Sequence, residues 1–392
     1  MPPLQTCPLC GSSNLRHFLT RESVPVHQNL IHKDHNAAIA ATTGELNMIV
    51  CEGCGFVFNR KFDMSKLSYG ENYDNTQDCS NFFDSYLDDL VSDLVENQGV
   101  KEGLVIEVGC GKGQFLQKLV ENPRSKLQGI GFDPSYENRG TKTYKNPSFV
   151  KDYYNAKYSN IGADYIVCRH VIEHVQDPLS LLRSTRKALS GSPKARIFFE
   201  TPCVEWILDN QVIWDFFYEH CSLFSASTLK LAFEKAGFGV ERVSHIFGGQ
   251  YLWIEAECSN ASNPSINHDS ARSLVSRAEQ FSENERQLRR EKEALVKDLH
   301  SKGNVALWGA GAKGVTVANL IDPEHEIIDC IVDVNPNKQG HFVPQTGHPI
   351  VAPADLRTRE VKHVLSMNPN YFAENAAWLA EHNPETQLLD WR

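Results

Sequence analysis

Long hydrophobic runs, an excess of basic charge and an N-terminal signal pattern are all lacking from this chain of 392 residues. No uninterrupted apolar run approaches the roughly 18 residues of a membrane-spanning helix, which argues against a membrane protein. The first residues lack the pattern of a secretory signal peptide, so we expect a cytoplasmic protein. Acidic side chains outnumber basic ones by 49 to 39, and the formal charge of −10 argues against nucleic acid or an anionic membrane as the partner.

The composition is that of a soluble globular protein, with 41% hydrophobic and 22% charged residues. The length is sufficient for two or three domains, each with its own core. The chain has eleven cysteines, of which four form two close pairs and the others are scattered singly. This usage favours a reducing compartment over a disulfide framework.

The paired cysteines predict a metal site. Cys7 and Cys10 form one Cys-x-x-Cys pair, Cys51 and Cys54 form the other, and a glycine follows each pair. Four thiolates can surround Zn²⁺ tetrahedrally and leave no open position, so we expect a structural zinc ion. Iron, a redox pair or unliganded thiols are the alternatives. Between the pairs, the stretch Val24-Pro25-Val26-His27-Gln28-Asn29 contains one histidine. His27 is expected to be structural, although it could reach the second domain.

A strand, a glycine-rich turn and a helix start follow one another over residues 105–116. Glu107 lies in the strand, and Gly109, Gly111 and Gly113 alternate in the turn. Glycine allows the backbone to approach a ligand closely, as adenosine-type cofactors require at the edge of a parallel sheet. Asp133 ends the next predicted strand, at the distance from the glycines where an acid accepts hydrogen bonds from ribose hydroxyls. From these residues alone, an NAD-binding unit remains an alternative.

The stretch Arg169-His170-Val171-Ile172-Glu173-His174-Val175-Gln176-Asp177-Pro178 extends this pattern. Together with Glu-x-Gly-x-Gly-x-Gly and the acid after the second strand, it resembles a class I S-adenosylmethionine (SAM) methyltransferase. The resemblance implies that the glycine turn holds the methionyl part, Asp133 the ribose and Asp152 the adenine. Tyr73 and Gln77 would cover the cofactor, although a tyrosine buried for packing is an equal alternative. The implied cofactor site comprises Tyr73, Gln77, Glu107, Gly109, Cys110, Gly111, Gly113, Asp133, Pro134, Asp152 and Arg169.

Strands and helices are expected to alternate from Val105 onward, as in a doubly wound sheet. The predicted strands end near Val108, Phe132, Arg169 and Glu200, with a shorter one before Asp152. Two helices over 177–189 and 225–237 and a closing hairpin over 240–257 follow. A long helix over 271–300 carries a near-heptad apolar stripe that Glu285 and Lys292 interrupt. We expect it to pack on a neighbouring domain, with an intermolecular coiled coil as the alternative.

The last ninety residues start with a second strand–turn–helix unit, over residues 305–315. Gly309, Gly311 and Gly314 form a Gly-x-Gly-x-x-Gly pattern, and Asp333 follows it. The motif by itself predicts NAD binding. Lys313 beside the helix start would equally suit a diphosphate, and a structural role is the third possibility.

The domain series resembles the NDP-sugar C-methyltransferases of deoxysugar biosynthesis. We therefore expect an α/β protein with a zinc-binding module at 1–75, a class I methyltransferase Rossmann-like sheet at 76–258, a linker with a long helix at 259–302, and a C-terminal Rossmann-like domain at 303–392. The resemblance implies methylation of a carbon next to a keto group on a nucleotide-linked sugar, with the last domain helping to bind the nucleotide. A monomer or a homodimer is expected.

Carbon methylation requires a base that removes the proton alpha to the ketone, and a donor that stabilises the enolate. His220 is the best candidate for the base, with Glu219 adjacent to orient it and His170 assisting in positioning or protonation. The sugar enzymes carry a Tyr-His-Glu-His run here, whereas Phe217 and Tyr218 precede Glu219-His220 in this chain. Tyr218 is a second candidate base or donor. Methylation of oxygen or nitrogen on another small molecule, with His220 or His174 as base, is the alternative function.

Overall fold

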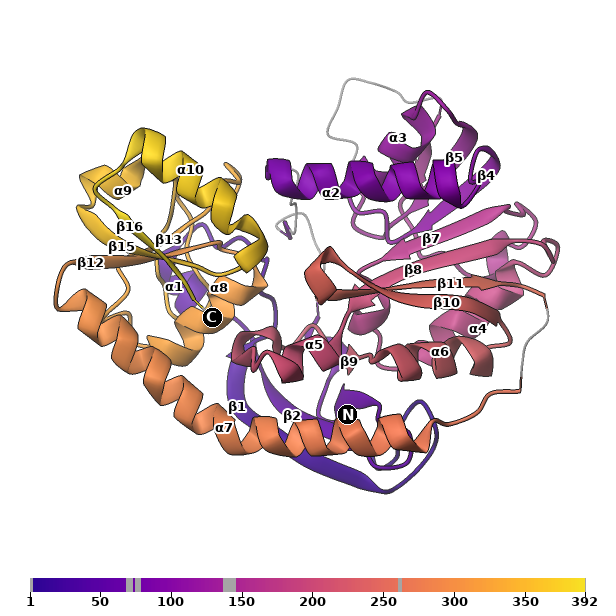
Figure 1. Ribbon diagram of the computed structural model, residues 1–392, viewed down its shortest axis with the longest axis horizontal. Coiled ribbons are helices and arrows are strands. Elements are labelled where there is room, and N and C mark those ends of the chain that lie inside the picture. The colour runs from indigo at the N-terminus through magenta and orange to yellow at the C-terminus, as the bar shows by residue number, and fades with distance from the viewer. Residues whose placement is uncertain (1–2, 68–72, 75–78, 137–145, 260–262, 392) are drawn as a thin grey trace.

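The computed structural model describes residues 3–67, 73–74, 79–136, 146–259 and 263–391. Three β-sheets form the framework, and Figure 1 shows the largest beside the C-terminal sheet, with the first sheet and one long helix below both. No helix in these described ranges combines the length and the apolar character needed to cross a membrane. Gln77, expected at the cofactor, lies outside the described residues.

The largest sheet has seven strands in the order β10-β11-β8-β7-β4-β5-β6. In this sheet β11 is antiparallel to both of its neighbours, β10 and β8, and all other neighbouring strands pair in parallel. The closing hairpin and this antiparallel strand confirm the expected class I Rossmann-like sheet. The strands are β4 (Glu102–Val108), β5 (Lys126–Phe132), β6 (Ser148–Val150), β7 (Tyr165–Arg169), β8 (Arg196–Pro202), β10 (Gly239–Ile246) and β11 (Tyr251–Glu257).

Helices cover both faces of this sheet. Successive residues of a strand, such as Phe198 and Phe199, enter separate hydrophobic cores because side chains alternate between faces. One core contains side chains of α2 and α3, and the other contains side chains of α4 and α6. The helices of this part are α2 (Asn81–Ser92), α3 (Gln114–Glu121), α4 (Pro178–Ala188), α5 (Val204–Asp209) and α6 (Ala226–Lys235).

The first sheet includes a strand from the middle of the chain. Its order is β1-β2-β3-β9, in which β9 (Ser222–Leu223) pairs with β3 (Val57–Asn59). The expected boundary near residue 75 therefore does not separate two independent modules, because the segment after His220 completes the N-terminal sheet. The other elements are β1 (Leu15–Pro25), β2 (Thr43–Cys51) and the short helix α1 (His35–Ile39).

The C-terminal sheet has five parallel strands in the order β14-β13-β12-β15-β16. The strands are β12 (Asn304–Trp308), β13 (Cys330–Val332), β14 (Ile350–Val351), β15 (Val361–Ser366) and β16 (Gln387–Asp390). Its helices are α8 (Ala312–Ile321), α9 (Asp355–Thr358) and α10 (Phe372–His382).

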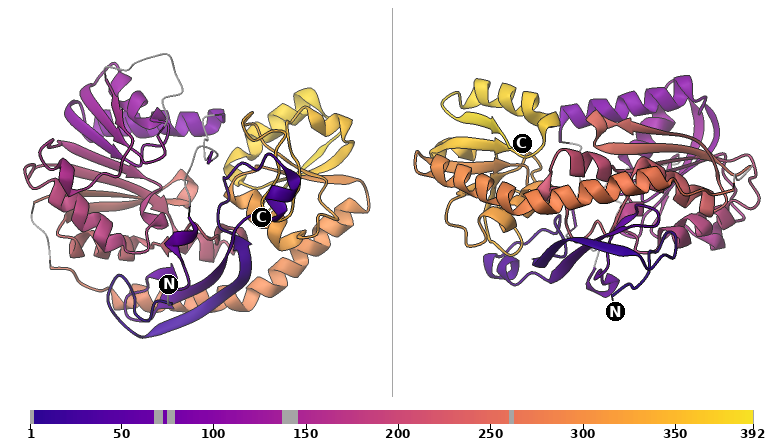
Figure 2. Two further views of the ribbon diagram at one scale, coloured as in Figure 1. Left: turned by 180° about the vertical axis from the view of Figure 1, so that it is seen from behind. Right: turned by 60° about the horizontal axis from the view of Figure 1, so that its bottom comes forward.

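The helix α7 (His268–His300) connects the three parts of the molecule (Figure 2). It contacts β1 and β2 of the first sheet, α5 of the central part, and β12 and α8 of the C-terminal part. The two residues that interrupt its apolar stripe make contacts between these parts. Glu285 pairs with Arg21 at 3.5 Å, and Lys292 donates to the carbonyl oxygen of Trp391. The apolar stripe of α7 therefore packs against other elements of the same chain, as expected for a helix laid on neighbouring domains.

Candidate active site and metal centre

The first glycine turn connects β4 to α3, and two of its glycines are required by the protein's own packing. Gly109 and Gly113 have φ values of +72° and +84°. A Cβ added to Gly109 would lie 2.2 Å from Val171, and one on Gly113 would lie 2.3 Å from Phe149. Gly111 differs, because its φ is +52° and a Cβ there would meet nothing within 4 Å. The space next to Gly111 is therefore open to a ligand.

Asp133 lies beside this turn. Its carboxylate accepts the Gly111 N–H at 2.9 Å, the Ser135 N–H at 2.8 Å and the Ser135 hydroxyl at 2.6 Å. These bonds fix the carboxylate against the turn, while a carboxylate has about four acceptor positions in total. Pro134 follows it and offers no N–H. Ribose hydroxyls could thus donate to the remaining positions of Asp133.

Buried ionic groups lie next to the turn. Burial raises the pKa of Glu107 to about 8, although nearby Arg169 favours its charged form. Arg169 donates to Glu200 at 2.6 Å, and the Tyr86 hydroxyl donates to the same carboxylate at 2.8 Å. Glu107 Oε2 and Arg169 Nη2 are buried and have no hydrogen-bond partner among the described residues. Such orphaned atoms are costly unless a ligand or water satisfies them, so the cradle fits a polar cofactor such as SAM.

The remaining cofactor candidates lie in different surroundings. Tyr73 forms an isolated antiparallel β-bridge with Leu30. Its ring meets the His27 ring edge-on, with the centroids 5.9 Å apart. Asp152 pairs with Lys157 and accepts the Tyr158 hydroxyl at 2.7 Å. Cys110 is buried and gives its N–H to the Phe132 carbonyl oxygen at 3.2 Å. The backbone of Cys110 therefore ties the turn to the end of β5, and its side chain is buried.

His170 is held by two carboxylates in a left-handed backbone conformation, with φ at +53°. Its Nδ1 lies 3.2 Å from Glu173, and its Nε2 lies 3.0 Å from Glu200. Burial disfavours the imidazolium, but Glu200 and Glu173 more than offset this and raise the pKa of His170 to about 9. Both ring nitrogens of His170 are therefore engaged by protein carboxylates, which favours positioning over protonation of the substrate.

The segment that leads to His220 is held by the N-terminal part. Arg21 donates to the carbonyl oxygens of Phe216 at 2.8 Å and Ile213 at 2.5 Å. Glu219 accepts from His27 at 3.1 Å and from the Gln28 N–H at 3.0 Å. The expectation that Glu219 orients His220 is therefore wrong, since this carboxylate binds across the domain boundary instead. The suggestion that His27 reaches the second domain is confirmed.

Tyr218 also points away from His220. Its ring is fully buried against Phe62, with centroids 5.3 Å apart, and its hydroxyl accepts the Asp63 N–H at 2.8 Å. The proposed use of Tyr218 as a base or donor is therefore wrong. Sequence reasoning missed Arg21 and Asp63, because nothing local marks residues whose partners lie more than 150 positions away.

His220 is partly exposed and has two ring neighbours. The Phe217 ring lies 4.0 Å away, and the His174 ring meets it edge-on at 4.8 Å, both measured between centroids. Burial lowers the pKa of His220 well below its usual value, and the positive charges of His174, His170 and Lys313 lower it further. The lowered pKa favours the neutral imidazole, which is the form that can accept a proton. Ligand atoms of Glu173, His174 and His220 all lie within 4.8 Å of one another.

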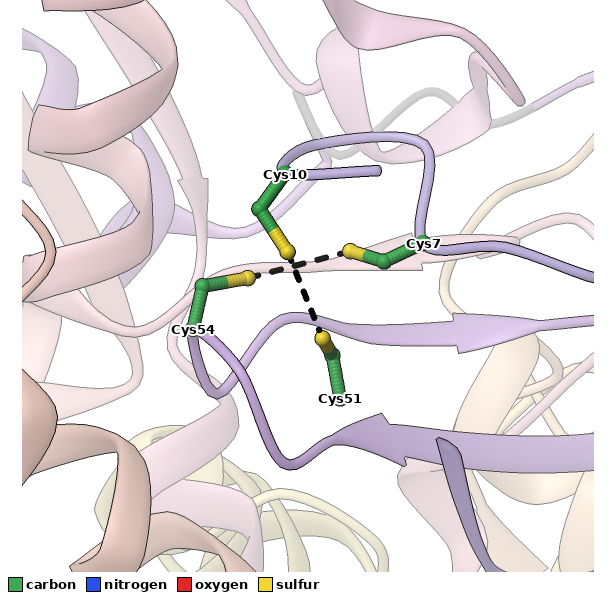
Figure 3. A group of neighbouring side chains, drawn as sticks. All are labelled: Cys7, Cys10, Cys51 and Cys54. Carbon is green, nitrogen blue, oxygen red and sulfur yellow. Dashed lines mark hydrogen bonds between the residues drawn. The ribbon is translucent and has the colours of Figure 1, made fainter. Parts of the chain in front are cut away.

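The four paired cysteines converge in the first sheet (Figure 3). The sulfur atoms of Cys7 and Cys54 are 3.7 Å apart, and those of Cys10 and Cys51 are 3.5 Å apart. Zinc bound tetrahedrally at about 2.3 Å sets its sulfur ligands roughly 3.8 Å apart, so the donor set fits this ion. Gly11 and Gly55 follow the pairs with φ of +81° and +83°, a backbone conformation that favours glycine at these bends.

The second glycine turn repeats the geometry of the first. Asp333 accepts the Ala310 N–H at 2.8 Å, as Asp133 accepts the Gly111 N–H. Its surroundings differ, because Lys338 donates both to Asn29 at 2.9 Å and to the Ala310 carbonyl oxygen at 3.0 Å. The segment around Asn29 thus covers this turn with protein, which favours the structural role among the three possibilities.

Comparisons with known proteins bear on both halves of the chain. Residues 81–243 match a family model described as a methyltransferase domain, and residues 266–383 match one described as a C-methyltransferase C-terminal domain. The chain is 23% identical to the C-methyltransferase NovU of Streptomyces niveus over 393 residues, which cover 95% of this chain and 91% of that protein. It is 29% identical to the tRNA U34 carboxymethyltransferase of Helicobacter acinonychis over 140 residues, covering 33% and 47% of the two proteins.

Among solved structures, magnesium protoporphyrin IX methyltransferase from Synechocystis PCC 6803 aligns with a TM-score of 0.36 and 14% identity. The alignment covers 49% of this chain and 91% of that chain. The two matched domains, and the match to NovU along nearly the whole length, carry the assignment. The chain is therefore a SAM-dependent methyltransferase that joins a methyltransferase domain to a C-terminal domain of the C-methyltransferase type.

Proposed function

We propose that this enzyme methylates a carbon alpha to a keto group of a nucleotide-linked sugar, with His220 as the base. The C-methyltransferase type of the C-terminal domain and the similarity to NovU support carbon as the acceptor atom. The order of a four-cysteine module, a SAM-binding sheet and a second Rossmann-like sheet supports the nucleotide-linked substrate through its resemblance to the sugar enzymes.

The chemistry explains why a base is needed. SAM supplies an electrophilic methyl group, but a sugar C–H bond is no nucleophile. Removal of the alpha proton gives an enolate whose carbon can attack the methyl group. His220 suits this step because its imidazole is neutral and partly exposed.

The developing enolate oxygen requires a donor. The position at which the sugar enzymes carry a tyrosine is Phe217 here, and the buried Tyr218 hydroxyl is engaged by Asp63. The His174 ring, which carries polar atoms, meets the His220 ring at 4.8 Å between centroids. We therefore assign His174 to the enolate oxygen and His220 to the alpha carbon.

In this proposal Cys7, Cys10, Cys51 and Cys54 hold one structural zinc ion. The ion would stabilise the turn that contains Cys7 and Cys10, before β1, and the turn from Cys51 to Cys54, which joins β2 to β3. Because β3 pairs with β9, the metal module would also fix the segment that carries His220.

The neutral, solvent-accessible imidazole of His220 carries the proposal, and proton exchange tests it. With S-adenosylhomocysteine bound, the enzyme should exchange deuterium from D₂O into the alpha carbon of a 4-keto nucleotide sugar. His220→Asn should abolish this exchange and lower methyl transfer by ~10²–10⁴-fold while SAM binding is retained.

His300→Asn, at the exposed end of α7, is the matched control and should behave as wild type. Exchange at the wild-type rate in His220→Asn would show that another group is the base. Methylation of a hydroxyl or amine without any exchange would replace the carbon assignment with O- or N-methylation.

A further inference from the structure

A cavity of about 730 Å³ is lined in part by Phe217, whose ring packs against His220. It is lined by the end of β1, the middle of α7, one side of α8, and Phe216 and Phe217. Gly111, Asp133 and His220 are not among its lining residues. Its volume lies within the range of roughly 300–1,000 Å³ that is usual for small-molecule sites.

Three buried polar atoms in the lining have no hydrogen-bond partner within the described part of the chain. They are Arg21 Nε, Gln28 Oε1 and Thr316 Oγ1. The three residues are only 7%, 2% and 6% exposed. An unsatisfied buried polar group costs about 1–3 kcal/mol, so three around one cavity indicate a site that receives a polar ligand.

The charge of the lining favours an anion. Arg286, Arg289 and Arg290 lie three and four positions apart on α7, a spacing that brings side chains to one helix face, and Arg21 faces them from β1. In the described ranges, the terminal amino groups of these three α7 arginines make no hydrogen bond and no ion pair.

Three carboxylates also line the cavity, but two are already paired. Glu285 binds Arg21 at 3.5 Å, and Glu293 binds Lys297 at 2.6 Å. Glu22 remains as the third. Among the described residues, the lining thus carries three α7 guanidinium groups and one carboxylate without an ion pair. Arg289 and Arg290 donate through Nε to the carbonyl oxygens of Leu320 and Arg286, so their terminal amino groups remain for a ligand.

We propose that this cavity binds a small phosphate-bearing anion of about the size of a nucleoside diphosphate. Guanidinium groups match phosphate oxygens in bidentate geometry, which assigns the phosphates to the α7 arginines. The Thr316 hydroxyl supplies one further donor, and the Gln28 side-chain carbonyl accepts from a donor group of the ligand.

A ligand bound in this cavity would affect the position of His220 through two contacts. Phe217 lines the cavity and packs against His220, and the backbone N–H of Gln28 donates to Glu219 in the same segment. The phosphates could belong to the acceptor's own nucleotide or to a separate effector. Both sources share this chemistry and differ in their kinetic consequences.

Titration calorimetry on the full-length protein tests the site, with inorganic pyrophosphate and uridine diphosphate as probes at physiological ionic strength. Wild type should bind both, and the double variant Arg286→Gln/Arg290→Gln should bind them at least tenfold more weakly. Thr316→Val, which removes only a hydroxyl, should weaken binding by a smaller factor. Arg272→Gln, an exposed arginine on α7 outside the cavity, should bind as wild type does.

Kinetics then distinguish the two sources. A raised acceptor KM with unchanged kcat in the double variant identifies the acceptor's nucleotide. An unchanged KM, with a methylation rate that depends on added uridine diphosphate only in wild type, identifies an effector. Absence of pyrophosphate and uridine diphosphate binding at millimolar concentration, or equal binding by the double variant and Arg272→Gln, would overturn the proposal. Calorimetry needs no methyl transfer, so failure of the proposed function would leave this test intact.

Discussion

The backbone N–H of Asn59 donates a 2.9 Å hydrogen bond to the carbonyl oxygen of Cys221, the residue that follows His220. Asn59 ends β3, and β3 begins shortly after the second cysteine pair. The pairing of Phe58 with Ser222 continues the same contact. The cysteine cluster and the segment that carries His220 are therefore connected through a single short strand.

Loss of the metal should consequently affect both folding and catalysis. Cys51→Ser removes one of four thiolates and should abolish zinc binding, because binding free energy in such modules is also folding free energy. We expect disorder of roughly the first 70 residues and loss of methyl transfer. Metal analysis by mass spectrometry and hydrogen exchange across residues 43–59 and 216–223 would measure both effects.

Cys79→Ser, at an exposed cysteine outside the cluster, serves as the control and should retain one zinc ion per chain. A wild-type protein without zinc, or an ordered first sheet in metal-free Cys51→Ser, would contradict the structural role of the ion.

Removal of the Asp133 carboxylate should weaken cofactor binding. Asp133→Ala eliminates a charged acceptor beside the open space at Gly111 and should reduce SAM affinity by ~1.5–3 kcal/mol, about ten- to a hundredfold. Calorimetry with SAM measures the change. Asp269→Ala, at an exposed acid near the start of α7, is the control.

Asp133 also holds the Gly111 and Ser135 N–H groups, so thermal unfolding of the ligand-free variant must be compared. Unaltered SAM affinity in a folded Asp133→Ala protein would show that the ribose does not bind at Asp133.

The His170 cluster predicts that stability falls at alkaline pH. The pKa of His170 is raised to about 9 from 6.5, so its contribution is complete below pH 6.5 and is lost as pH rises through 9. Glu107 acts in the same direction, since its pKa is raised to about 8 and ionisation in the buried site is unfavourable. We expect the free energy of unfolding to fall by about 1–3 kcal/mol between pH 6.5 and 9.5.

Urea denaturation at a series of pH values measures this dependence. His170→Gln retains a hydrogen-bonding side chain but cannot titrate. It should reduce the slope of the profile between pH 6.5 and 9, and the Glu107 contribution should remain below pH 8. His300→Gln, at an exposed histidine, should leave the profile unchanged. A wild-type profile that rises over this range would contradict the charged state assigned to His170.

Local patterns in the sequence predicted the central sheet well. The glycine turn, the strand ends at Val108 and Phe132 and the closing hairpin all depend on local signals: β-branched runs, glycines and caps. The N-terminal sheet could not be predicted in the same way, because its fourth strand comes from Ser222 and Leu223, far along the chain.

The roles of neighbouring residues around His220 also escaped prediction. Sequence adjacency placed Glu219 next to His220, but successive side chains in an irregular segment point in different directions. Glu219 turns toward His27 and Tyr218 toward Asp63, while His174, distant in sequence, becomes the ring neighbour of His220. The interruptions Glu285 and Lys292 in the long helix were visible as departures from its stripe, yet their partners Arg21 and Trp391 became known only from the structure.

Phe217 offers the most specific test of the proposed chemistry. Its ring packs against His220 at 4.0 Å, in the position where the sugar enzymes are expected to carry a tyrosine. Phe217→Tyr would introduce a phenol beside the proposed base, where it can donate to the enolate oxygen. Because a positioned acid or donor contributes ~10²–10⁴-fold in established cases, we expect a gain of at least severalfold in deuterium exchange at the alpha carbon.

Phe216→Tyr is the matched control, since it makes the same chemical change at the neighbouring residue. Phe216 is 1% exposed, with its ring 5.7 Å from Phe18 and 5.1 Å from Phe281, so the added hydroxyl would be buried among apolar rings. It should destabilise the fold by about 1–3 kcal/mol and leave exchange no faster than in wild type. If Phe217→Tyr folds normally, binds SAM and still exchanges no faster than wild type, then the enolate oxygen does not lie beside Phe217. His174, which we assign to the enolate oxygen, would then act as its donor without help from residue 217.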